Sequence, residues 1–340
     1  MFHVVVNPAG ASGRTGRIWA ELEPVFRESG KPYEVHFSTK RHGLGEICAE
    51  LTENADTEYT DIIVVGGDGT MNEVLNGIGD LSRVRLGYIP GGSANDFGLD
   101  IGLPKDRAQI THTILEGRVR REENVGEVLF HNVFSEFVGN ERRVIERREE
   151  NSGLTRRFLV SCGIGFDAAV CEQVESSRFK NVLNRLHVGK LIYIAVAIRM
   201  ILRCPMQTFK ITLRGRSALP GAADVPSPEL VMEKKNTLFA VGMNHRYEGG
   251  GFQFCPHARP DDDSVDFCMA SPASRLQFFQ VFPKAYSGDH VKFDLITQDR
   301  AEEITMETEL PSWVHTDGEI HFTSTKITLR TLPEKIRFLM

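Results

Sequence analysis

One run of residues constrains the fold of this chain more than any other. Four β-branched residues at 62–65 lead directly into Gly66-Gly67-Asp68-Gly69-Thr70, and residues 71–76 continue with a helical pattern. This order is typical of a buried parallel strand, a tight turn and a following helix. Glycines let backbone N–H groups approach an anion, and the helix N-terminus adds its positive dipole end. A plain strand-to-helix turn with Thr70 as N-cap remains the alternative.

The first third of the chain repeats this strand-and-helix pattern. Apolar residues at helical spacing predict a helix around residues 18–26, where Pro24 predicts a kink, and two more around residues 47–51 and 74–78. Alternating strands and helices predict a doubly wound α/β domain with a parallel sheet. The expected strands are residues 4–6, 33–37, 62–65 and 86–89.

After about Asn124 the pattern changes to short strand-like runs without regular helices between them, which predicts a mostly antiparallel β-sandwich-like second domain. A helical segment at 168–203 interrupts it, and residues 216–235, with three prolines, are expected to form a long loop. The expected strands are residues 158–161, 209–213, 237–241, 265–269, 291–296 and 320–322.

Two more glycine-rich loops follow predicted strands of the first domain. Asn7-Pro8-Ala9-Gly10 follows the first strand, and Pro90-Gly91-Gly92-Ser93-Ala94-Asn95-Asp96 follows the fourth. The carboxyl ends of strands in a doubly wound sheet share one edge, where ligands bind. Three such loops on one edge favour phosphate binding over a simple turn. The spacing matches neither a Walker A motif nor GxGxxG.

Charge and cysteine usage exclude other classes. With 46 acidic and 40 basic residues the formal charge is -6, which provides no global positive field for nucleic acid. The chain opens with a strand-like run, and no uninterrupted apolar run approaches 18 residues, so we expect a cytoplasmic protein that does not span the membrane. Cysteines without metal-binding spacing are expected to be reduced core residues: Cys48, Cys162, Cys171, Cys204, Cys255 and Cys268.

Taken together, "NPAG…GGDGTMNEVLNG…PGGSANDF" resembles the catalytic domain of the diacylglycerol kinase superfamily, in particular its bacterial soluble lipid kinases, with sphingosine kinases as relatives. GGDGT alone is shared with NAD kinases, whereas the longer pattern is specific to the lipid kinases. The resemblance continues in order through residues 163–168, 249–251 and 256–258, and through Asp317-Gly318-Glu319.

This resemblance implies an ATP-binding domain at 1–123 that the chain rejoins at 326–340, a lipid-substrate domain at 124–325, and an active-site cleft between them. It also implies Mg²⁺ as a cofactor beside ATP. The residues implied to contact ATP are Asn7, Thr39, Gly66, Gly67, Asp68, Gly69, Thr70, Met71, Asn72 and Ser93.

The resemblance further implies that the Asp317-Gly318-Glu319 motif is catalytic, with Glu319 as the general base toward the lipid hydroxyl. Asp68 is the competing candidate, because an Asp in a phosphate-binding loop can hold Mg²⁺ through water or accept the proton itself. From the residues alone, Asp317-Gly318 is a common hairpin turn.

A structural Mg²⁺ is implied at Asp262, with backbone carbonyls of Arg259 and Ser264 as further ligands. Asp263 departs from the family pattern, because it stands where relatives carry glycine. Either the backbone there accepts a left-handed Asp, or the loop and its metal are arranged differently. The alternative is an ordinary solvated acidic loop.

Residues 176–204 carry six basic residues and no acidic residue, in a chain that is acidic overall. This segment can form a helix that lies on an anionic membrane, or a core-packed helix with solvated charges. His315, two residues before Asp317, is the one histidine singled out. The basic residues are Arg178, Lys180, Arg185, Lys190, Arg199 and Arg203.

The leading hypothesis is therefore an ATP-dependent, Mg²⁺-requiring lipid kinase that phosphorylates diacylglycerol or a related lipid, in the cytoplasm or at the inner membrane surface. A kinase of a soluble substrate such as NAD is the first alternative, and a non-catalytic nucleotide- or lipid-binding regulator is the second. The expected partners are the lipid and a membrane surface without nucleic acid, and a homodimer is left open.

Overall fold

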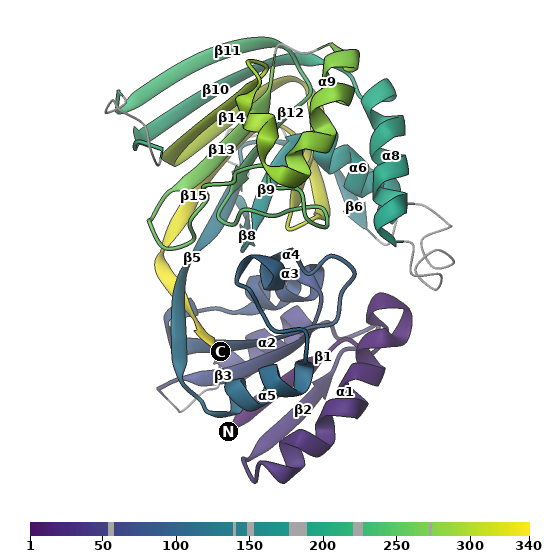
Figure 1. The fold of residues 1–340 in the computed structure, drawn as a ribbon, viewed down its shortest axis with the longest axis vertical. Coiled ribbons are helices and arrows are strands. Elements are labelled where there is room, and N and C mark those ends of the chain that lie inside the picture. Colours follow the sequence, from purple (N-terminus) through teal and green to yellow (C-terminus); the bar gives the residue numbers. More distant parts are fainter. Residues whose placement is uncertain (54–57, 139–140, 148–152, 177–188, 220–226, 272–273) are drawn as a thin grey trace. The chain divides into compact units, whose positions relative to one another are not determined.

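The computed structural model describes residues 1–53, 58–138, 141–147, 153–176, 189–219, 227–271 and 274–340. The chain forms two compact units (Figure 1). Unit 1 consists of Met1–Val125 and Pro333–Met340, and unit 2 consists of Gly126–Leu332. The chain therefore leaves unit 1 and returns to it with its last residues.

Unit 1 is built on parallel strands in the order β4-β3-β1-β2. The end of a long C-terminal strand, β15 (Glu319–Leu339), pairs parallel with β4 at Arg337 and Phe338. All seven residues of β3 are buried, as expected for a strand covered on both faces. The other strands are β1 (Phe2–Val6), β2 (Tyr33–Phe37), β3 (Thr60–Gly66) and β4 (Val84–Pro90).

Helices follow the strands of this sheet. Phe2, Val4 and Val6 of β1 pack with residues of the first and fifth helices, whereas His3 and Val5 point to the opposite face. The doubly wound parallel sheet predicted from the sequence is confirmed. The helices are α1 (Gly10–Glu28), α2 (Leu44–Glu53), α3 (Asp68–Gly77), α4 (Asp96–Asp100) and α5 (Arg107–Leu115), with a 3₁₀ turn at η1 (Leu81–Arg83).

Helix α1 contains the expected proline but breaks elsewhere. The helix includes Pro24, whereas Ala11, Ser12 and Gly13 have positive φ angles of 47°, 59° and 83°. The irregular backbone thus lies in the loop that follows β1, at the same sheet edge as the other glycine-rich loops.

Unit 2 is a mostly antiparallel β structure, as predicted. Strand β14 (Ile296–Thr316) pairs with four neighbours, β9, β10, β13 and β15. The remaining strands are β5 (Val119–Phe130), which begins in unit 1, β6 (Val133–Val138), β7 (Glu141–Arg147), β8 (Leu154–Phe158), β9 (Ser161–Gly165), β10 (Gln207–Arg216), β11 (Glu229–Thr237), β12 (Phe239–Met243) and β13 (Val265–Ala270).

Two apolar clusters hold unit 2 together. One fills the interior between strands and includes Phe158, Phe209 and Phe267, and the other packs helices against the sheet through Phe166, Phe239 and further aromatic residues. The helices are α6 (Phe166–Glu175), α8 (Gly189–Arg203) and α9 (Arg275–Val281), followed by 3₁₀ turns η2 (Phe282–Ser287) and η3 (Asp289–Lys292). The predicted helical segment at 168–203 falls on α6 and α8, and its residues 177–188 lie outside the described part of the chain.

Three expectations for unit 2 were wrong. Residues 158–161 are not one strand, because β8 ends at Phe158 and β9 begins at Ser161. Residues 291–296 lie mostly in or beside η3, where His290 is buried and bonds the Phe254 carbonyl at 3.1 Å. Part of the expected loop at 216–235 is strand β11, whose alternating Leu230 and Met232 pack on the core. Tertiary contacts decide these local structures.

The six cysteines are free thiols, and five of them are buried, as expected for core residues. Among the described residues, no helix combines the length and the apolar character needed to cross a bilayer.

Candidate active site

Two glycine-rich loops meet backbone to backbone at the carboxyl ends of β3 and β4. The Gly91 N–H donates to the Gly66 carbonyl at 2.6 Å. A Cβ atom on Gly67 would lie 2.7 Å from the Gly92 Cα, and one on Gly92 would lie 2.6 Å from the Gly67 Cα. Only glycine permits this approach, so both glycines are required by the contact between the loops.

Asp68 joins these loops. Its Oδ2 accepts from the Asp96 N–H at 3.1 Å and its Oδ1 from the Phe97 N–H at 3.3 Å, so its carboxylate caps the N-terminus of α4. Helix α3 begins at Asp68 with Gly67 as N-cap and without a side-chain cap. The alternative in which Thr70 is the N-cap is therefore wrong, because Thr70 lies inside the first turn. The positive end of α3 lies at this sheet edge.

Asn95 closes the second loop from within. Its backbone is left-handed (φ 54°), its Oδ1 accepts from the Gly92 N–H at 2.8 Å, and its Nδ2 donates to the Gly92 carbonyl at 3.0 Å. The Tyr88 hydroxyl lies 3.3 Å from Asn95 Oδ1. Burial, followed by the charges of Asp68 and Asp96, raises the pKa of Tyr88 well above its usual value. Both carboxylates therefore lie close enough to act on one hydroxyl.

Arginines that the sequence analysis missed support the same loop. Arg14 donates to the carbonyls of Gly91, at 2.8 Å, and Gly92, and Arg107 donates to the Pro90 carbonyl at 2.8 Å. Burial lowers the pKa of Arg14, and the charges of Arg107 and Arg17 lower it further. The carbonyl groups of this loop thus accept hydrogen bonds from arginine side chains. The positive charge of these arginines lies beside the loop and favours binding of an anion there. An arginine directly after the glycine-rich run at 10–13 is the signal that could have indicated this.

The other residues predicted to contact ATP occupy different positions along this edge. Asn7 follows β1 and its Oδ1 accepts from the Ala9 N–H, whereas Thr39, beyond β2, accepts from two backbone N–H groups of its own turn. Ser93 is exposed. Met71 and Asn72 are buried in α3, at 1% and 3% exposure, so their side chains shape the helix rather than face solvent.

The second half of the GGDGTMNEVLNG motif serves packing. Glu73 Oε1 accepts from the Leu44 N–H at 2.7 Å and from the Gly45 N–H at 3.4 Å, which caps α2. A Cβ atom on Gly77 would collide with the Gly45 carbonyl. The motif therefore fixes α2 against α3 as well as forming the loop.

In unit 2, Asp317-Gly318 is the hairpin turn between β14 and β15. Both residues have positive φ angles, 52° and 82°, as a type I′ turn requires. The Asp317 carboxylate accepts from the N–H groups of Leu159 (2.9 Å), Val160 (2.8 Å) and Ser161 (3.1 Å). Asp317 thus fixes the turn to the β8–β9 connection.

Glu319 begins β15 and is half-buried. Burial lowers the pKa of Arg156, whereas the charge of Glu319 raises it. The Arg156 Nη2 donates to His321 Nδ1 at 3.1 Å, and the other His321 nitrogen lies 3.0 Å from Thr316 Oγ1. Burial, with the charges of Arg156 and His315, lowers the pKa of His321 to about 3, so His321 is neutral and accepts from Arg156.

The predicted metal loop carries a different cation. The Asp262 carboxylate lies 2.8 Å from the Arg300 guanidinium, which also pairs with Asp266 at 3.1 Å and donates to the His257 carbonyl at 2.9 Å. Burial raises the pKa of Asp266 to about 6 despite Arg300. A metal on Asp262 does not fit this arrangement, because a buried guanidinium already neutralises that carboxylate.

The ligand atoms predicted beside Asp262 have local roles. The Ser264 N–H donates to Asp262 Oδ1 at 3.3 Å, and Arg259 pairs with Asp261 at 3.2 Å. Asp263 has φ 59°, so the backbone at this position is left-handed with Asp in place of glycine. The left-handed Asp of the first alternative is therefore present, whereas Arg300 pairs with the carboxylate on which the metal was expected.

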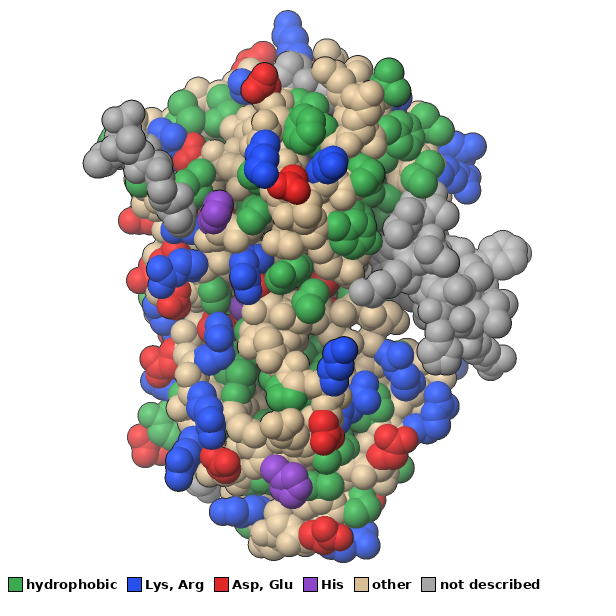
Figure 2. All heavy atoms as spheres, viewed as in Figure 1, with side chains coloured by type: hydrophobic (Ala, Val, Ile, Leu, Met, Phe, Trp, Pro, Cys, Tyr) green, Lys and Arg blue, Asp and Glu red, His purple; other side chains and the backbone are tan. Residues whose placement is uncertain are grey.

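Only the end of the basic segment is described with its side chains. Arg178, Lys180 and Arg185 lie outside the described residues. In the last two turns of α8, Ala197 and Ile201 are buried, whereas Ile198 and Leu202 are 46% and 58% exposed. Arg199 and Arg203 are exposed beside them. Figure 2 shows hydrophobic side chains at the surface over α8 and α9, where Leu276 is also exposed.

Comparison with known proteins covers nearly the whole chain. Residues 1–126 match the family model of the diacylglycerol kinase catalytic domain. Residues 160–340 match that of the YegS C-terminal NAD kinase beta sandwich-like domain.

Individual relatives agree with both matches. The chain is 26% identical to YtlR of Bacillus subtilis, a candidate lipid kinase, over 98% of this chain and 97% of that protein. It is 25% identical to a diacylglycerol kinase of Mycobacterium tuberculosis over 82% of this chain and 74% of that protein. The crystal structure of a candidate diacylglycerol kinase from Bacillus anthracis superposes with a TM-score of 0.69 at 21% identity, over 99% of this chain and 96% of that one, and so has the same fold.

Proposed function

The chain belongs to the diacylglycerol kinase family of lipid kinases, and from this premise we propose that it transfers the γ-phosphoryl group of ATP to the hydroxyl of diacylglycerol or a related lipid. The observation that carries the proposal is the backbone contact between Gly67 and Gly92 at the end of a parallel sheet. That contact leaves a loop lined by backbone, with the N-terminus of α3 beside it, where the phosphates of ATP can lie.

Glu319 is our candidate for the general base. Asp317 is occupied by three backbone donors, and both oxygens of Asp68 accept N–H groups of α4, so both carboxylates have structural duties. Glu319 follows the hairpin turn on a half-buried strand end. A carboxylate held on a rigid turn is suited to orient a hydroxyl and accept its proton late in the transfer.

Mg²⁺ would neutralise the charge that develops on the phosphates. Asp68 is the residue of this chain that we propose to face it, because its carboxylate lies where the two glycine-rich loops meet and carboxylate oxygens are the ligands that a hard cation prefers. The pairing of Asp262 with Arg300 argues against the second, structural Mg²⁺ of the sequence analysis.

A membrane surface is the proposed partner. The exposed face of α8 combines Ile198 and Leu202 with Arg199 and Arg203, which suits the boundary between acyl chains and anionic headgroups. An enzyme that meets its substrate at such a surface is expected to work faster on vesicles that contain anionic lipid.

The test offers purified protein Mg²⁺ and γ-labelled ATP with vesicles containing diacylglycerol, with and without anionic lipid, and with NAD in a separate reaction. We expect label in the organic phase, more of it with anionic lipid, and none after Asp68→Ala. Label on NAD would instead support a kinase of a soluble substrate. ATP binding without transfer to either acceptor would support a non-catalytic regulator.

A further inference from the structure

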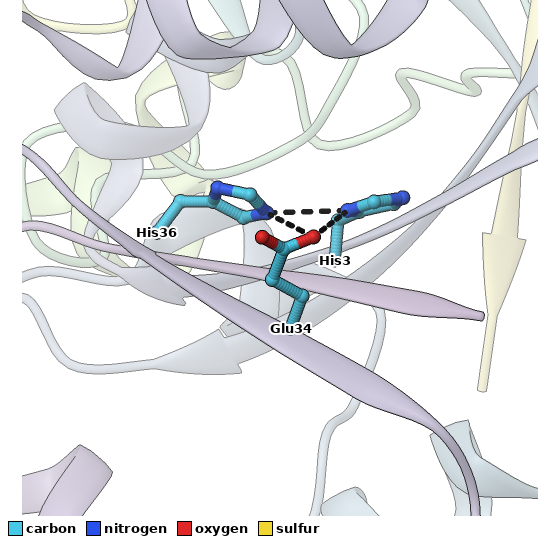
Figure 3. Close-up of side chains that lie close together, drawn as sticks. All are labelled: His3, Glu34 and His36. Atoms are coloured by element: carbon cyan, nitrogen blue, oxygen red, sulfur yellow. Dashed lines mark hydrogen bonds and ion pairs between the residues drawn. The ribbon is translucent and has the colours of Figure 1, made fainter.

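Two histidines and a glutamate converge at the outer edge of the sheet in unit 1. His3 lies on β1, and Glu34 and His36 lie on the neighbouring strand β2, where the register places His3 opposite Glu34. Figure 3 shows the two imidazole rings facing each other with the Glu34 carboxylate beside both. His3 Nδ1 is 3.1 Å from His36 Nε2, and Glu34 Oε2 is 3.8 Å from each of these nitrogens.

We propose that these three side chains, the edge cluster, form a site for a divalent transition-metal ion of the Zn²⁺ type. A triangle with sides of 3.1, 3.8 and 3.8 Å has its centre about 2.1 Å from every corner. Zinc bonds to imidazole nitrogen and carboxylate oxygen have this length, roughly 2.0–2.2 Å. The three atoms therefore already stand at the spacing that one shared ion requires.

The surroundings of the edge cluster suit an exchangeable ion. The side chains of His3 and His36 are 15% and 19% exposed and that of Glu34 is 57% exposed, so an ion can enter and keep a water as fourth ligand. Imidazole ligands select Zn²⁺, Co²⁺, Ni²⁺ or Cu²⁺ over Mg²⁺ and Ca²⁺.

Such an ion would link the edge strand β2 to its neighbour β1. Among the described residues β2 pairs with β1 alone, so its other side carries no neighbouring strand. Ligands from both strands would join β2 to β1 through side chains in addition to the ladder of backbone hydrogen bonds. We therefore expect the ion to stabilise unit 1.

The test uses chelator-stripped, tag-free protein titrated with Zn²⁺ against a chromophoric chelator. We expect one equivalent to bind and to raise the melting temperature, and Glu34→Gln and His36→Ala to weaken binding at least 10-fold. His112→Ala, which removes an exposed histidine on α5, should bind as the wild type does. No binding to the wild type, or equal binding to all variants because the ion sits elsewhere, would overturn the proposal.

A second cluster, in unit 2, carries an independent inference. His315 Nε2 is 3.1 Å from Asp167 Oδ2 and 3.2 Å from Glu248 Oε1, and all three residues are buried. A Cβ atom on Gly163 would collide with the Asp167 carboxylate, so that glycine makes room for the group. On its other side, His315 Nδ1 accepts the Gly318 N–H at 3.2 Å.

These contacts fix where the proton of the imidazole lies. Because Nδ1 accepts a hydrogen bond, Nε2 must carry a proton, and it donates toward the two carboxylates. A metal at Nε2 is thereby disfavoured. Burial raises the pKa of the Asp167 carboxyl, which faces Nε2. The cluster therefore retains protons on the Nε2 side.

We infer that His315 is a positioning residue for Glu319. Gly318 lies between Asp317 and Glu319, so its N–H bond to His315 orients the peptide that precedes the candidate base, while Asp167 and Glu248 hold the imidazole in the required tautomer. This inference rests on the proposed function, because it assigns a purpose to the orientation of Glu319.

Two substitutions test the roles of the two ring nitrogens separately. The side-chain amide of His315→Asn can keep a hydrogen-bond acceptor near the position of Nδ1. The longer side chain of His315→Gln can instead keep a donor near the position of Nε2. We expect His315→Gln to lower kcat about 10-fold or more, with little change in KM for ATP, and His315→Asn to retain more of the activity. Nitrogen NMR of labelled histidine should show a protonated Nε2 and a bare Nδ1 in the wild type.

The outcomes distinguish the inference from its premise. A wild type without lipid kinase activity would refute the proposed function, whatever the NMR result. An active wild type with equally active variants, or with a bare Nε2, would refute the positioning role alone. Folding of each variant is checked by circular dichroism, and a variant with lowered kcat but unchanged melting temperature supports positioning over a general structural effect.

Discussion

Replacing Glu319 by glutamine is expected to lower kcat for lipid phosphorylation by about 100-fold to 10,000-fold, the range that general-base catalysis usually contributes. Glutamine preserves the shape of the side chain but cannot accept the proton of the lipid hydroxyl. ATP binding should change little, because Glu319 lies in unit 2 and the glycine-rich loops belong to unit 1. The measurement is initial-rate kinetics with labelled ATP, alongside nucleotide binding by calorimetry.

Glu233→Gln is the matched control, since Glu233 is exposed on β11. It should leave kcat within a factor of about two. If Glu319→Gln keeps more than a tenth of the activity, Glu319 is not the base. Asp68→Asn then becomes the decisive comparison, because Asp68 is the other carboxylate for that role.

Replacing Gly67 by alanine should have the second large effect. The added Cβ would lie 2.7 Å from the Gly92 Cα, and both partners are backbone, so neither can rotate away. We expect the two loops to separate, with a loss of about 1–3 kcal/mol in unfolding free energy. ATP affinity should fall at least about 10-fold, since a shift of the loops moves the N–H groups that would surround the phosphates. Urea unfolding and nucleotide titration measure the two effects.

Gly79→Ala provides the control for this substitution. A Cβ atom on Gly79 has no neighbour within 4 Å, so the same chemical change should leave ATP affinity unaltered. If Gly67→Ala binds ATP as tightly as Gly79→Ala does, then the contact between the loops does not form the nucleotide site, and the main support for the proposed function is lost.

Local pattern was sufficient for much of unit 1. The β-branched run at 62–65 forms a buried strand because its residues fit a covered sheet, and the glycines after it form the expected turn. The type I′ turn at Asp317-Gly318 likewise follows from residues that tolerate positive φ. Where short-range geometry selects the backbone conformation, the neighbouring residues in the sequence are sufficient to predict it.

Local pattern failed where distant residues decide the structure. The run at 158–161 is apolar like a strand, yet Leu159 and Val160 direct their N–H groups to Asp317, more than 150 positions away. The 3₁₀ turn at Asp289–Lys292 replaces an expected strand because His290 is held by Phe254. No window of a few residues contains such partners.

The candidate site divides in the same way. The glycine loops and Asp317-Gly318-Glu319 are contiguous motifs that can be recognised in the sequence. Arg14 and Arg156 are isolated residues, and the edge cluster joins residues that are far apart in the sequence, so no motif indicates them. His3 and His36 meet only because β1 and β2 are parallel neighbours in register. Arg300 is the clearest case, since its pairing with Asp262 changes the interpretation of a loop that looks like a metal site.

The return of β15 to unit 1 has a consequence for synthesis of the protein. Leu339 belongs to the apolar cluster of unit 1, and Phe338 packs against Phe97 with ring centroids 4.9 Å apart. The first 125 residues thus emerge from the ribosome long before the strand that completes their core. At bacterial and eukaryotic elongation rates of roughly 5–20 residues per second, this delay is about 10–40 seconds. During this interval the open side of β4 is an unpaired edge, a natural place for a chaperone to act.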